Sequence, residues 1–429
     1  MLQELKIKNF RSFRDEVVLN FEATKDTMFD ECHVVEVSPG VRLLRLALVY
    51  GANASGKSNL LKAIEFLREF WFARRDDMDE STEAIPFLLD QDTPNEPSQF
   101  EMKFWVGDVK YWYILSLNQK YVVSEKLYYY GSVQPTMLFQ REMEKGRSVI
   151  HFNASIVKVP AIVVDEISLK CLPNISFFAA RNKVNCTLPF IDEARDWMKN
   201  GFLPLIEPQT RMFDYAGKKM LEDATLKNYM LDFVHKADFN ITGVNTEKES
   251  VAMPGFVRDA LLGDDRLSKI DKEKLLEDPV VNRIHTDFEH TVKNSRGVEK
   301  YTMSNELQSE GTRRTFGIEA AIYEALEKEK FLSVDEIESS LHPELVEFIL
   351  QQFLRKQNRS QMLITSHYDP LLNTIDDLIR KDSVWFTEKG EDGHTNLYSL
   401  VEFRGLNKIS SFQRSYRNGV FGALPNILG

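Results

Sequence analysis

The feature that most constrains the fold is the segment GANASGKS, Gly51–Ser58, which has the pattern G-x-x-x-x-G-K-S. The dense apolar run Val41–Tyr50 precedes it, and the segment NLLKAIEFLREFW after it places apolar residues on one helical stripe. The glycines let the backbone wrap close to phosphate, and successive N–H groups and the helix N-terminus then point at anionic oxygens. Strand, loop and helix in this order predict a nucleotide-phosphate site in an α/β fold.

Two residues at the end of this loop have distinct expected roles. Lys57 reaches the β- and γ-phosphates of a bound nucleotide, and the hydroxyl of Ser58 binds Mg²⁺. The expected cofactors are therefore ATP and Mg²⁺.

Two carboxylates end a second apolar run, FLSVDE, Phe331–Glu336. Asp335 suits the Mg²⁺ shell, and Glu336 is placed to polarise an attacking water. His367 directly follows another short apolar strand, QMLITS. Because ligands of open α/β sheets bind at the carboxyl ends of strands, His367 is expected near the γ-phosphate or the water. The expected catalytic residues are Lys57, Glu336 and His367.

The segment SEGTRR, Ser309–Arg314, has two interpretations. It opens a strongly helical run, so an N-capped core helix is one of them. The other is half of an anion site completed by another chain, because the free N–H groups at a helix N-terminus bind anions. In that case the contributing residues are Ser309, Gly311 and Thr312 as small donors, with Arg313 or Arg314 adding charge.

The order of phosphate loop, long insertion, SEGTRR, acidic strand and histidine resembles that of the ABC-type ATPases. In that family a serine-glycine signature caps the γ-phosphate bound by a second subunit. Here Glu310 replaces a small residue, and no Gly-Gly-Gln follows. More narrowly, the chain resembles the OLD-like and RloA-like ATPases, relatives of the RecF and SMC repair ATPases. The resemblance is carried by KIKNFRSF, YGANASGKSNLLKAI, SEGTRR, SVDEIESSLHPEL, LITSH and the tail RNGVFGALP.

This resemblance implies roles for particular residues. It implies Mg²⁺ at Ser58 and Asp335, a catalytic base at Glu336 and a switch role for His367. The expected nucleotide-binding residues are Gly51, Asn53, Ser55, Gly56, Lys57, Ser58 and Asn59, with Ser309, Gly311, Thr312 and Arg313.

Other positions are assigned less fully by the resemblance. The segment ESSLHP, Glu338–Pro343, occupies the loop that faces the partner subunit, with His342 where the broader family often has an acid. Arg11 matches a position near the phosphates in the relatives. A glutamine that joins one lobe to Mg²⁺ corresponds to Gln91 or Gln99, and the sequence does not choose between them.

Composition limits the protein class. The 429 residues are 43% hydrophobic and 28% charged, with a net charge of −11, so nucleic acid would need a local basic patch. Basic pairs such as Lys218–Lys219 are more simply a solvated face. Three widely spaced cysteines form no metal motif, and no apolar run is long enough to span a membrane. A soluble, cytoplasmic protein with no membrane partner is expected.

The expected fold class is α/β: an ABC-type P-loop ATPase head with a largely parallel sheet, a β-rich N-terminal lobe and an inserted helical subdomain. Residues 1–180 form the first lobe with its antiparallel β region, and residues 181–300 form the insertion. Residues 301–429 form the second lobe with SEGTRR, the acidic strand and His367.

The resemblance also suggests a biological setting. OLD proteins continue into a Toprim nuclease, but too little chain follows His367 for that fold. The chain therefore resembles the ATPase halves of two-gene phage-defence systems of the Rlo, Septu and PARIS kind. These are expected to oligomerise through shared ATP sites and to control a separately encoded nuclease or toxin.

The alternative is a DNA-repair ATPase of RecF or SMC type that binds DNA in an ATP-dependent way. A transporter subunit would need a groove for a membrane partner. A small-molecule kinase would not need SEGTRR.

Overall fold

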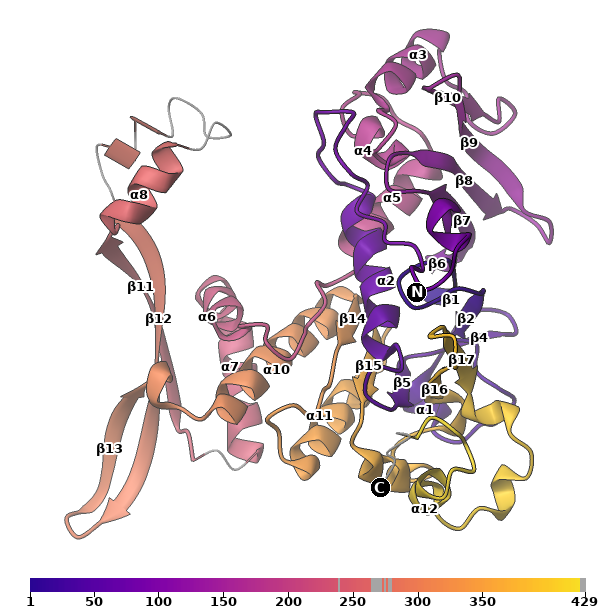
Figure 1. The fold of residues 1–429 in the computed structure, drawn as a ribbon. Coiled ribbons are helices and arrows are strands. Elements are labelled where there is room, and N and C mark those ends of the chain that lie inside the picture. The colour runs from indigo at the N-terminus through magenta and orange to yellow at the C-terminus, as the bar shows by residue number, and fades with distance from the viewer. Residues whose placement is uncertain (238–239, 264–271, 274, 277–279, 425–429) are drawn as a thin grey trace. The chain divides into compact units, whose positions relative to one another are not determined.

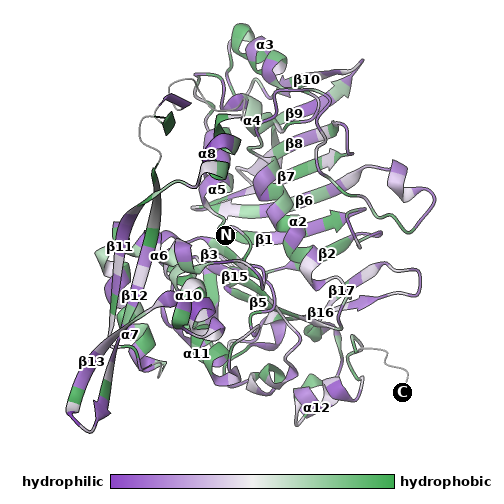
Figure 2. Cartoon of the chain, turned by 60° about the vertical axis from the view of Figure 1, so that its left-hand side comes forward, coloured by the Kyte–Doolittle hydropathy of each residue, from purple (hydrophilic) through white to green (hydrophobic). Residues whose placement is uncertain are grey.

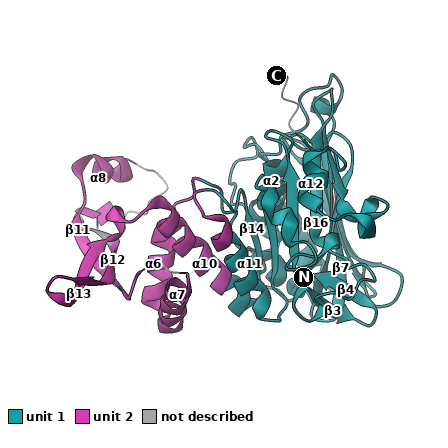
Figure 3. Cartoon of the chain, turned by 90° about the horizontal axis from the view of Figure 1, so that it is seen from below, with its two compact units in different colours: residues 1–208, 324–339, 346–429 teal, residues 209–323, 340–345 magenta. Residues whose placement is uncertain are grey.

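The computed structural model describes residues 1–237, 240–263, 272–273, 275–276 and 280–424. The chain divides into two compact units, coloured separately in Figure 3. Unit 1 contains residues 1–208, 324–339 and 346–429, and unit 2 contains residues 209–323 and 340–345. The last residue of the RNGVFGALP tail, Pro425, lies outside the described residues.

Unit 1 is built around two sheets and the helices that cover them (Figure 1). Its helices are α1 (Asp30–His33), α2 (Lys57–Phe70), α3 (Ala161–Lys170), α4 (Phe177–Arg181), α5 (Ile191–Asn200), most of α11 (Pro343–Arg355) and α12 (Phe412–Arg417). A small two-stranded ribbon is made of β3 (Val34–Ser38) and β4 (Val41–Leu44).

The five-stranded sheet of unit 1 is mostly parallel, with the order β14-β15-β5-β16-β17. The pairs β14–β15, β15–β5 and β5–β16 are parallel, and only β17 runs the other way. Its strands are β5 (Leu46–Gly51), β14 (Phe331–Val334), β15 (Gln361–Ser366), β16 (Val384–Lys389) and β17 (Thr395–Ser399). Continuous burial along β5, β14 and β15 is expected of a parallel sheet covered on both faces.

The seven-stranded sheet is antiparallel throughout, with the order β10-β9-β8-β7-β6-β1-β2. Burial alternates along strands such as β7, and Figure 2 colours the strands of this sheet with a mixture of hydrophilic and hydrophobic residues. Its strands are β1 (Leu2–Lys8), β2 (Val17–Asn20), β6 (Ser98–Val106), β7 (Val109–Leu117), β8 (Val122–Tyr130), β9 (Thr136–Glu144) and β10 (Arg147–Phe152).

The predicted α/β head, with its largely parallel sheet and β-rich lobe, is confirmed by this arrangement. The apolar run Val41–Tyr50 forms two strands instead of one, because the chain breaks at Arg45. The Arg45 side chain is fully buried and donates to carbonyl groups at the end of α11, including Phe353 O at 3.1 Å. A buried guanidinium needs many acceptors, and the strand break lets Arg45 reach them.

Unit 2 differs from the expected helical insertion. It holds α6 (Phe213–Glu222), α7 (Ala224–Lys236), α8 (Gly255–Leu262) and most of α10 (Glu310–Lys328). It also holds a three-stranded antiparallel sheet in the order β11-β12-β13. These strands are β11 (Gly243–Ala252), β12 (Val280–Asn294) and β13 (Gly297–Ser304).

The expected helical subdomain over 181–300 contains helices but also strands that were not expected, for a physical reason. Strands β11 and β13 are largely exposed and carry charged residues toward both faces, so they lack the polar–apolar alternation that marks a strand. Phe288 of β12 is fully buried and packs on Phe213 and Phe316, with ring centroids 5.7 and 5.3 Å away. This aromatic contact between distant segments is not visible in the sequence pattern.

The expected boundaries also shift. Helix α5 lies inside 181–300 but belongs to unit 1, where Trp197 stacks on Phe104 of β6 with ring centroids 4.3 Å apart. In the other direction, residues 301–323, which include SEGTRR, belong to unit 2. The apolar stripe of a helix predicts that one face is buried, but it does not predict which element covers that face.

Candidate nucleotide site

The phosphate loop leaves the carboxyl end of β5 and enters α2 at Lys57. Gly56 has φ of +110°, and the neighbouring Ala54 has φ of +60°. A Cβ on Gly56 would lie 2.2 Å from Oγ1 of Thr395. A Cβ on Gly51 would lie 2.4 Å from Oγ1 of Thr387. Close approach to neighbouring strands thus requires both glycines of the motif, and backbone conformation requires glycine at position 56 as well.

Hydroxyl groups from β16 and β17 hold this loop. Ser55 Oγ lies 2.6 Å from Thr387 Oγ1, and Thr395 donates to the carbonyl of Ser55 at 2.8 Å. Ser12 bridges the same region, because its Oγ lies 2.8 Å from Thr395 Oγ1 and accepts from the amide of Asn59 at 2.8 Å. The side chains of Ser55 and Asn59, both expected to bind nucleotide, therefore also brace the loop. Sequence analysis did not single out the two threonines, which lie in no recognised motif, or Ser12, which lies within KIKNFRSF.

Lys57 is folded back onto its own loop. Its Nζ donates to the carbonyl of Gly51 at 2.7 Å and to that of Ala52 at 3.1 Å. The side chain is buried, and burial lowers the pKa of Lys57. The ammonium group thus sits inside the cradle where phosphate oxygens would replace the carbonyl acceptors.

Three carboxylates raise the pKa of Lys57 and so oppose the effect of burial. The contribution of Glu336 is the largest, followed by those of Asp335 and Glu338. They therefore lie within electrostatic reach of the ammonium group. All three follow β14, whose neighbour β15 separates it from β5. Three adjacent parallel strands thus deliver the loop, the acidic turn and His367 to one edge of the sheet, where α/β proteins bind ligands.

The acidic turn is organised by Thr365 on β15. Its hydroxyl donates to Asp335 Oδ1 at 2.5 Å, and it accepts from the backbone N–H of Glu336 at 2.9 Å. Asp335 is buried, while Glu336 is half-buried with a left-handed φ of +45°. Strained non-glycine residues concentrate at functional sites, and this turn has such a residue where the catalytic base is expected.

His367 lies just beyond β15 and pairs with Glu338, with Nδ1 2.9 Å from Oε1. The imidazole is about half exposed, whereas the Glu338 side chain is nearly buried. Glu338 was noted in the sequence only as the start of the ESSLHP loop.

The SEGTRR segment lies in unit 2 at the start of α10. Ser309 Oγ accepts from the backbone N–H of Thr312 at 3.1 Å, which is an N-cap contact. A Cβ on Gly311 would lie 2.5 Å from the carbonyl oxygen of Ser340. Gly311 of SEGTRR and Ser340 of the ESSLHP segment therefore pack together within unit 2, and the contact of Ser309 is that of a helix N-cap.

The remaining expected positions are placed as follows. Arg11 lies in the turn that ends in Ser12, its backbone N–H donates to Ile85 O at 2.7 Å, and burial lowers its pKa. Gln91 lies in an exposed loop, and Gln99 is exposed on β6. His342 is also exposed.

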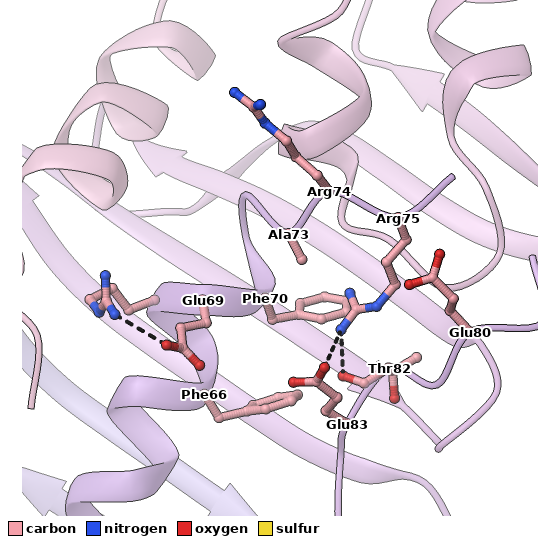
Figure 4. Close-up of a pocket in the computed structure, with 10 residues that line it drawn as sticks. Phe66, Glu69, Phe70, Ala73, Arg74, Arg75, Glu80, Thr82 and Glu83 are labelled. Carbon is pink, nitrogen blue, oxygen red and sulfur yellow. Dashed lines mark hydrogen bonds and ion pairs between the residues drawn. The ribbon is translucent and has the colours of Figure 1, made fainter. Parts of the chain in front are cut away.

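A hollow near the other end of α2 does not contain these groups (Figure 4). Arg75 donates there to the carbonyl of Thr82 at 3.3 Å and pairs with Glu83 at 3.7 Å. Phe70, the last residue of α2, lines it, roughly 20 Å along the helix from Lys57 at 1.5 Å per residue. Its charged groups largely pair with one another, as in the pairs Arg68–Glu69 and Arg75–Glu83.

The described residues are compatible with Mg²⁺. They contain no group of three or more His, Cys, Asp and Glu side chains arranged as a metal cage. Mg²⁺ at a nucleotide needs only one or two protein ligands, with phosphate and water completing its shell. Ser58 in the first turn of α2 and Asp335, held by Thr365, supply such a set.

None of the helices in the described part of the chain combines the length and the apolar composition needed to cross a membrane.

The phosphate loop after β5, the acidic turn after β14 and the antiparallel lobe define the head fold of an ABC-type P-loop ATPase. Residues 46–153 and 231–373 match the family described as "AAA domain, putative AbiEii toxin, Type IV TA system". This match takes in more than half of the chain, and the protein belongs to that family. The matched ranges include the phosphate loop, SEGTRR, the acidic turn and His367.

Comparison with curated proteins finds no match. Among solved structures, the chain is similar to the SMC head domain from Thermotoga maritima, at 13% identity and a TM-score of 0.38, covering 93% of this chain and 98% of that one. It is also similar to an SMC head bound to the C-winged helix domain of ScpA, at 14% identity and a TM-score of 0.46, covering 94% and 99%. A third is an SMC head with an extended coiled coil from Pyrococcus furiosus, at 13% identity and a TM-score of 0.38, covering 94% and 97%.

Proposed function

We propose that this protein binds ATP with Mg²⁺ and hydrolyses it. The observation that carries the proposal is the delivery of Lys57, the Asp335–Glu336 turn and His367 to one edge of a sheet by adjacent parallel strands. A phosphate cradle beside a strained acidic turn is suited to transfer of the γ-phosphoryl group to water.

Each residue then has one task. Lys57 exchanges the carbonyl groups of Gly51 and Ala52 for phosphate oxygens. Ser58 and Asp335 would hold Mg²⁺, which would supply positive charge to neutralise the phosphates. Glu336 accepts a proton from the attacking water, and His367 contacts the γ-phosphate or that water.

The proposal includes self-association through shared ATP sites. In it, Ser309, Gly311, Thr312 and Arg313 of one subunit close over the nucleotide of another. The packing of Gly311 against Ser340 supports this, because it joins the two segments that the family resemblance assigns to the partner-facing surface. ATP would then shift the population from open to closed assemblies.

In its finer form, the proposal makes this ATPase the regulator of a separately encoded nuclease or toxin in bacterial antiphage defence. Support comes from the resemblance to two-gene systems and from the wording of the family description, which refers to a toxin system. Fold alone does not fix such a role, so a partner must be found experimentally.

The test is native mass spectrometry of Glu336→Gln purified from its host, with and without ATP and Mg²⁺. Because Gln cannot take the proton, the variant should retain ATP and accumulate a closed assembly. We expect a doubling of mass or a larger complex that contains a second polypeptide.

The matched control is the double variant Lys57→Ala/Glu336→Gln, which should stay in its nucleotide-free state. A single-chain mass under all conditions would contradict the shared site. ATP turnover by Glu336→Gln at the wild-type rate would contradict the assigned base. Duplex DNA added to the same samples separates the RecF-like alternative, which requires an ATP-dependent DNA complex.

A further inference from the structure

Within the described part of the chain, the carboxylate of Glu338 accepts its hydrogen bonds from the segment that carries His367. Its Oε1 accepts from the backbone N–H of His367 at 2.7 Å and from that of Tyr368 at 3.2 Å. The same oxygen lies 2.9 Å from Nδ1 of His367. The other oxygen, Oε2, is buried and has no hydrogen bond within the described part of the chain.

This arrangement joins two strand ends. Glu338 is three residues beyond Asp335 in the turn after β14, and His367 is the first residue after β15. The carboxylate therefore ties the acidic turn to the histidine segment across two adjacent parallel strands.

The contact also decides the chemistry of the imidazole. A carboxylate is only an acceptor, so Nδ1 must carry the proton in this contact. In neutral imidazole the proton on Nδ1 leaves Nε2 as an acceptor, as in the carboxylate–histidine pairs that orient metal-binding histidines. The Nε2 edge is then available to reacting groups, consistent with a side chain that is 52% exposed.

We propose that Glu338 is a positioning residue that holds His367 in its Nδ1–H tautomer and aims Nε2 at the γ-phosphate and the attacking water. This inference rests on the proposed ATPase function, because His367 has a catalytic task only there. Glu338 acts through His367 and touches no reacting atom.

A simpler role must be separated from this one. Glu338 could serve only as a cap for the two backbone N–H groups. Glutamine keeps a carbonyl acceptor for those groups but loses the negative charge beside Nδ1. Glu338→Gln should therefore retain the loop while weakening control of the imidazole.

The first experiment is a double-mutant cycle in ATP hydrolysis with Glu338→Gln, His367→Ala and the combined variant. We expect Glu338→Gln to lower kcat about tenfold, the lower end of the effect of losing a partner that orients a histidine ligand. The KM for ATP should change less than about twofold. The combined variant should match His367→Ala, because the proposed task of Glu338 is to orient the imidazole and ends when the imidazole is removed.

The matched control is Glu391→Gln, a change of the same charge in an exposed loop of the same unit. Its kcat should stay at the wild-type value. A wild-type kcat for Glu338→Gln, or losses that multiply in the combined variant, would overturn the proposal.

A second readout observes the tautomer directly. In protein with ¹⁵N-labelled histidine, the signals that His367→Ala removes identify His367. They should report a protonated Nδ1 in the wild type and a mixed tautomer in Glu338→Gln. If the tautomer is the same in Glu338→Gln as in the wild type, Glu338 serves only to accept hydrogen bonds from the backbone of the loop.

Different results would contradict the proposed ATPase function and the proposed role of Glu338. If Lys57→Ala and Glu336→Gln hydrolyse ATP normally, the proposed function itself is wrong. If they are inactive but Glu338→Gln is normal, only the role of Glu338 is wrong.

Discussion

At the scale of single residues, one hydroxyl controls both acidic positions of the site. Thr365 donates to Asp335 and accepts from the N–H of Glu336, so it sets the carboxylate expected to bind Mg²⁺ and the strained residue after it. Neither contact is visible in the pattern LITSH, where Thr365 looks like one more strand residue.

Replacing Thr365 with Val should therefore impair hydrolysis. The change keeps shape but leaves a buried carboxylate oxygen and a backbone N–H without this partner, at a cost of about 1–3 kcal/mol. We expect a reduced kcat and weaker apparent binding of Mg²⁺ in steady-state ATPase assays. Thr365→Ser, which keeps the hydroxyl, should recover most of the activity; equal loss in both variants would show that the methyl group matters instead.

A buried acid in unit 2 makes stability depend on pH. Glu319 of α10 is fully buried, accepts from the hydroxyl of Tyr229, and burial raises its pKa to about 8. The folded state therefore holds a proton that the unfolded state releases near its ordinary pKa of 4.5. The contribution of protonated Glu319 to the free energy of unfolding is fully present below pH 4.5. It is lost as pH rises toward 8, at a rate of at most about 1.4 kcal/mol per pH unit.

Glu319→Gln should remove this dependence, because the amide is always neutral. We expect the Tm of wild type to fall relative to the variant between pH 5 and 8, and the difference to level off above pH 8. Glu327→Gln, exposed on the same helix, is the control and should follow wild type. Parallel Tm profiles for wild type and Glu319→Gln would mean that Glu319 is ionised in the folded state.

At the scale of elements, the phosphate loop depends on the strands beside it. Thr387 on β16 and Thr395 on β17 hold a loop that begins on β5. The edge strand β17 therefore contributes to the site although it carries no recognised motif.

Gly56→Ala tests this dependence. The added methyl meets the branched side chain of Thr395 at 2.2–2.9 Å, and the left-handed backbone adds strain of about 1 kcal/mol or more. We expect ATP affinity, measured by isothermal titration calorimetry, to fall at least about tenfold. Gly146→Ala, with φ of +77° and open space around it, isolates the strain alone and should leave affinity unchanged.

At the scale of the whole molecule, the shared-site proposal predicts complementation between inactive subunits. Lys57→Ala removes the loop function and keeps SEGTRR, whereas Arg313→Glu does the reverse. Mixed assemblies would contain one intact site made from the loop of one subunit and the signature of the other. We expect each variant to be inactive alone and their mixture to recover part of the ATPase activity.

The control mixture joins Lys57→Ala with Glu336→Gln, which damage the same half of the site. It should stay inactive, because no site then has an intact loop and acidic turn. If both proteins are folded and the first mixture recovers no activity, Arg313 belongs to a core helix and contributes to no ATP site of another subunit.

The parts of the fold and of the candidate site that could be predicted are those whose interacting residues lie close together in the sequence. Gly51–Ser58 and Phe331–Glu336 are contiguous, so their strand, loop and turn structure could be predicted from local pattern. Thr387, Thr395 and Glu338 could not, because their partners belong to other strands. The β11–β13 sheet was missed for a related reason: its exposed, charged strands carry little periodic signal, and Phe288 finds its aromatic partners only after folding.

The sequence by itself determined the elements whose chemistry is local: the glycine conformations of the phosphate loop, the apolar strands before each polar turn and the amphipathic helix α2. Tertiary structure alone decided the strand order that brings three strand ends to one edge. It also decided which hydroxyl groups hold the loop and that Glu338 binds His367. The physical reason is that backbone conformation and hydrophobic period act over a few residues, whereas hydrogen bonds between strands depend on register and neighbours.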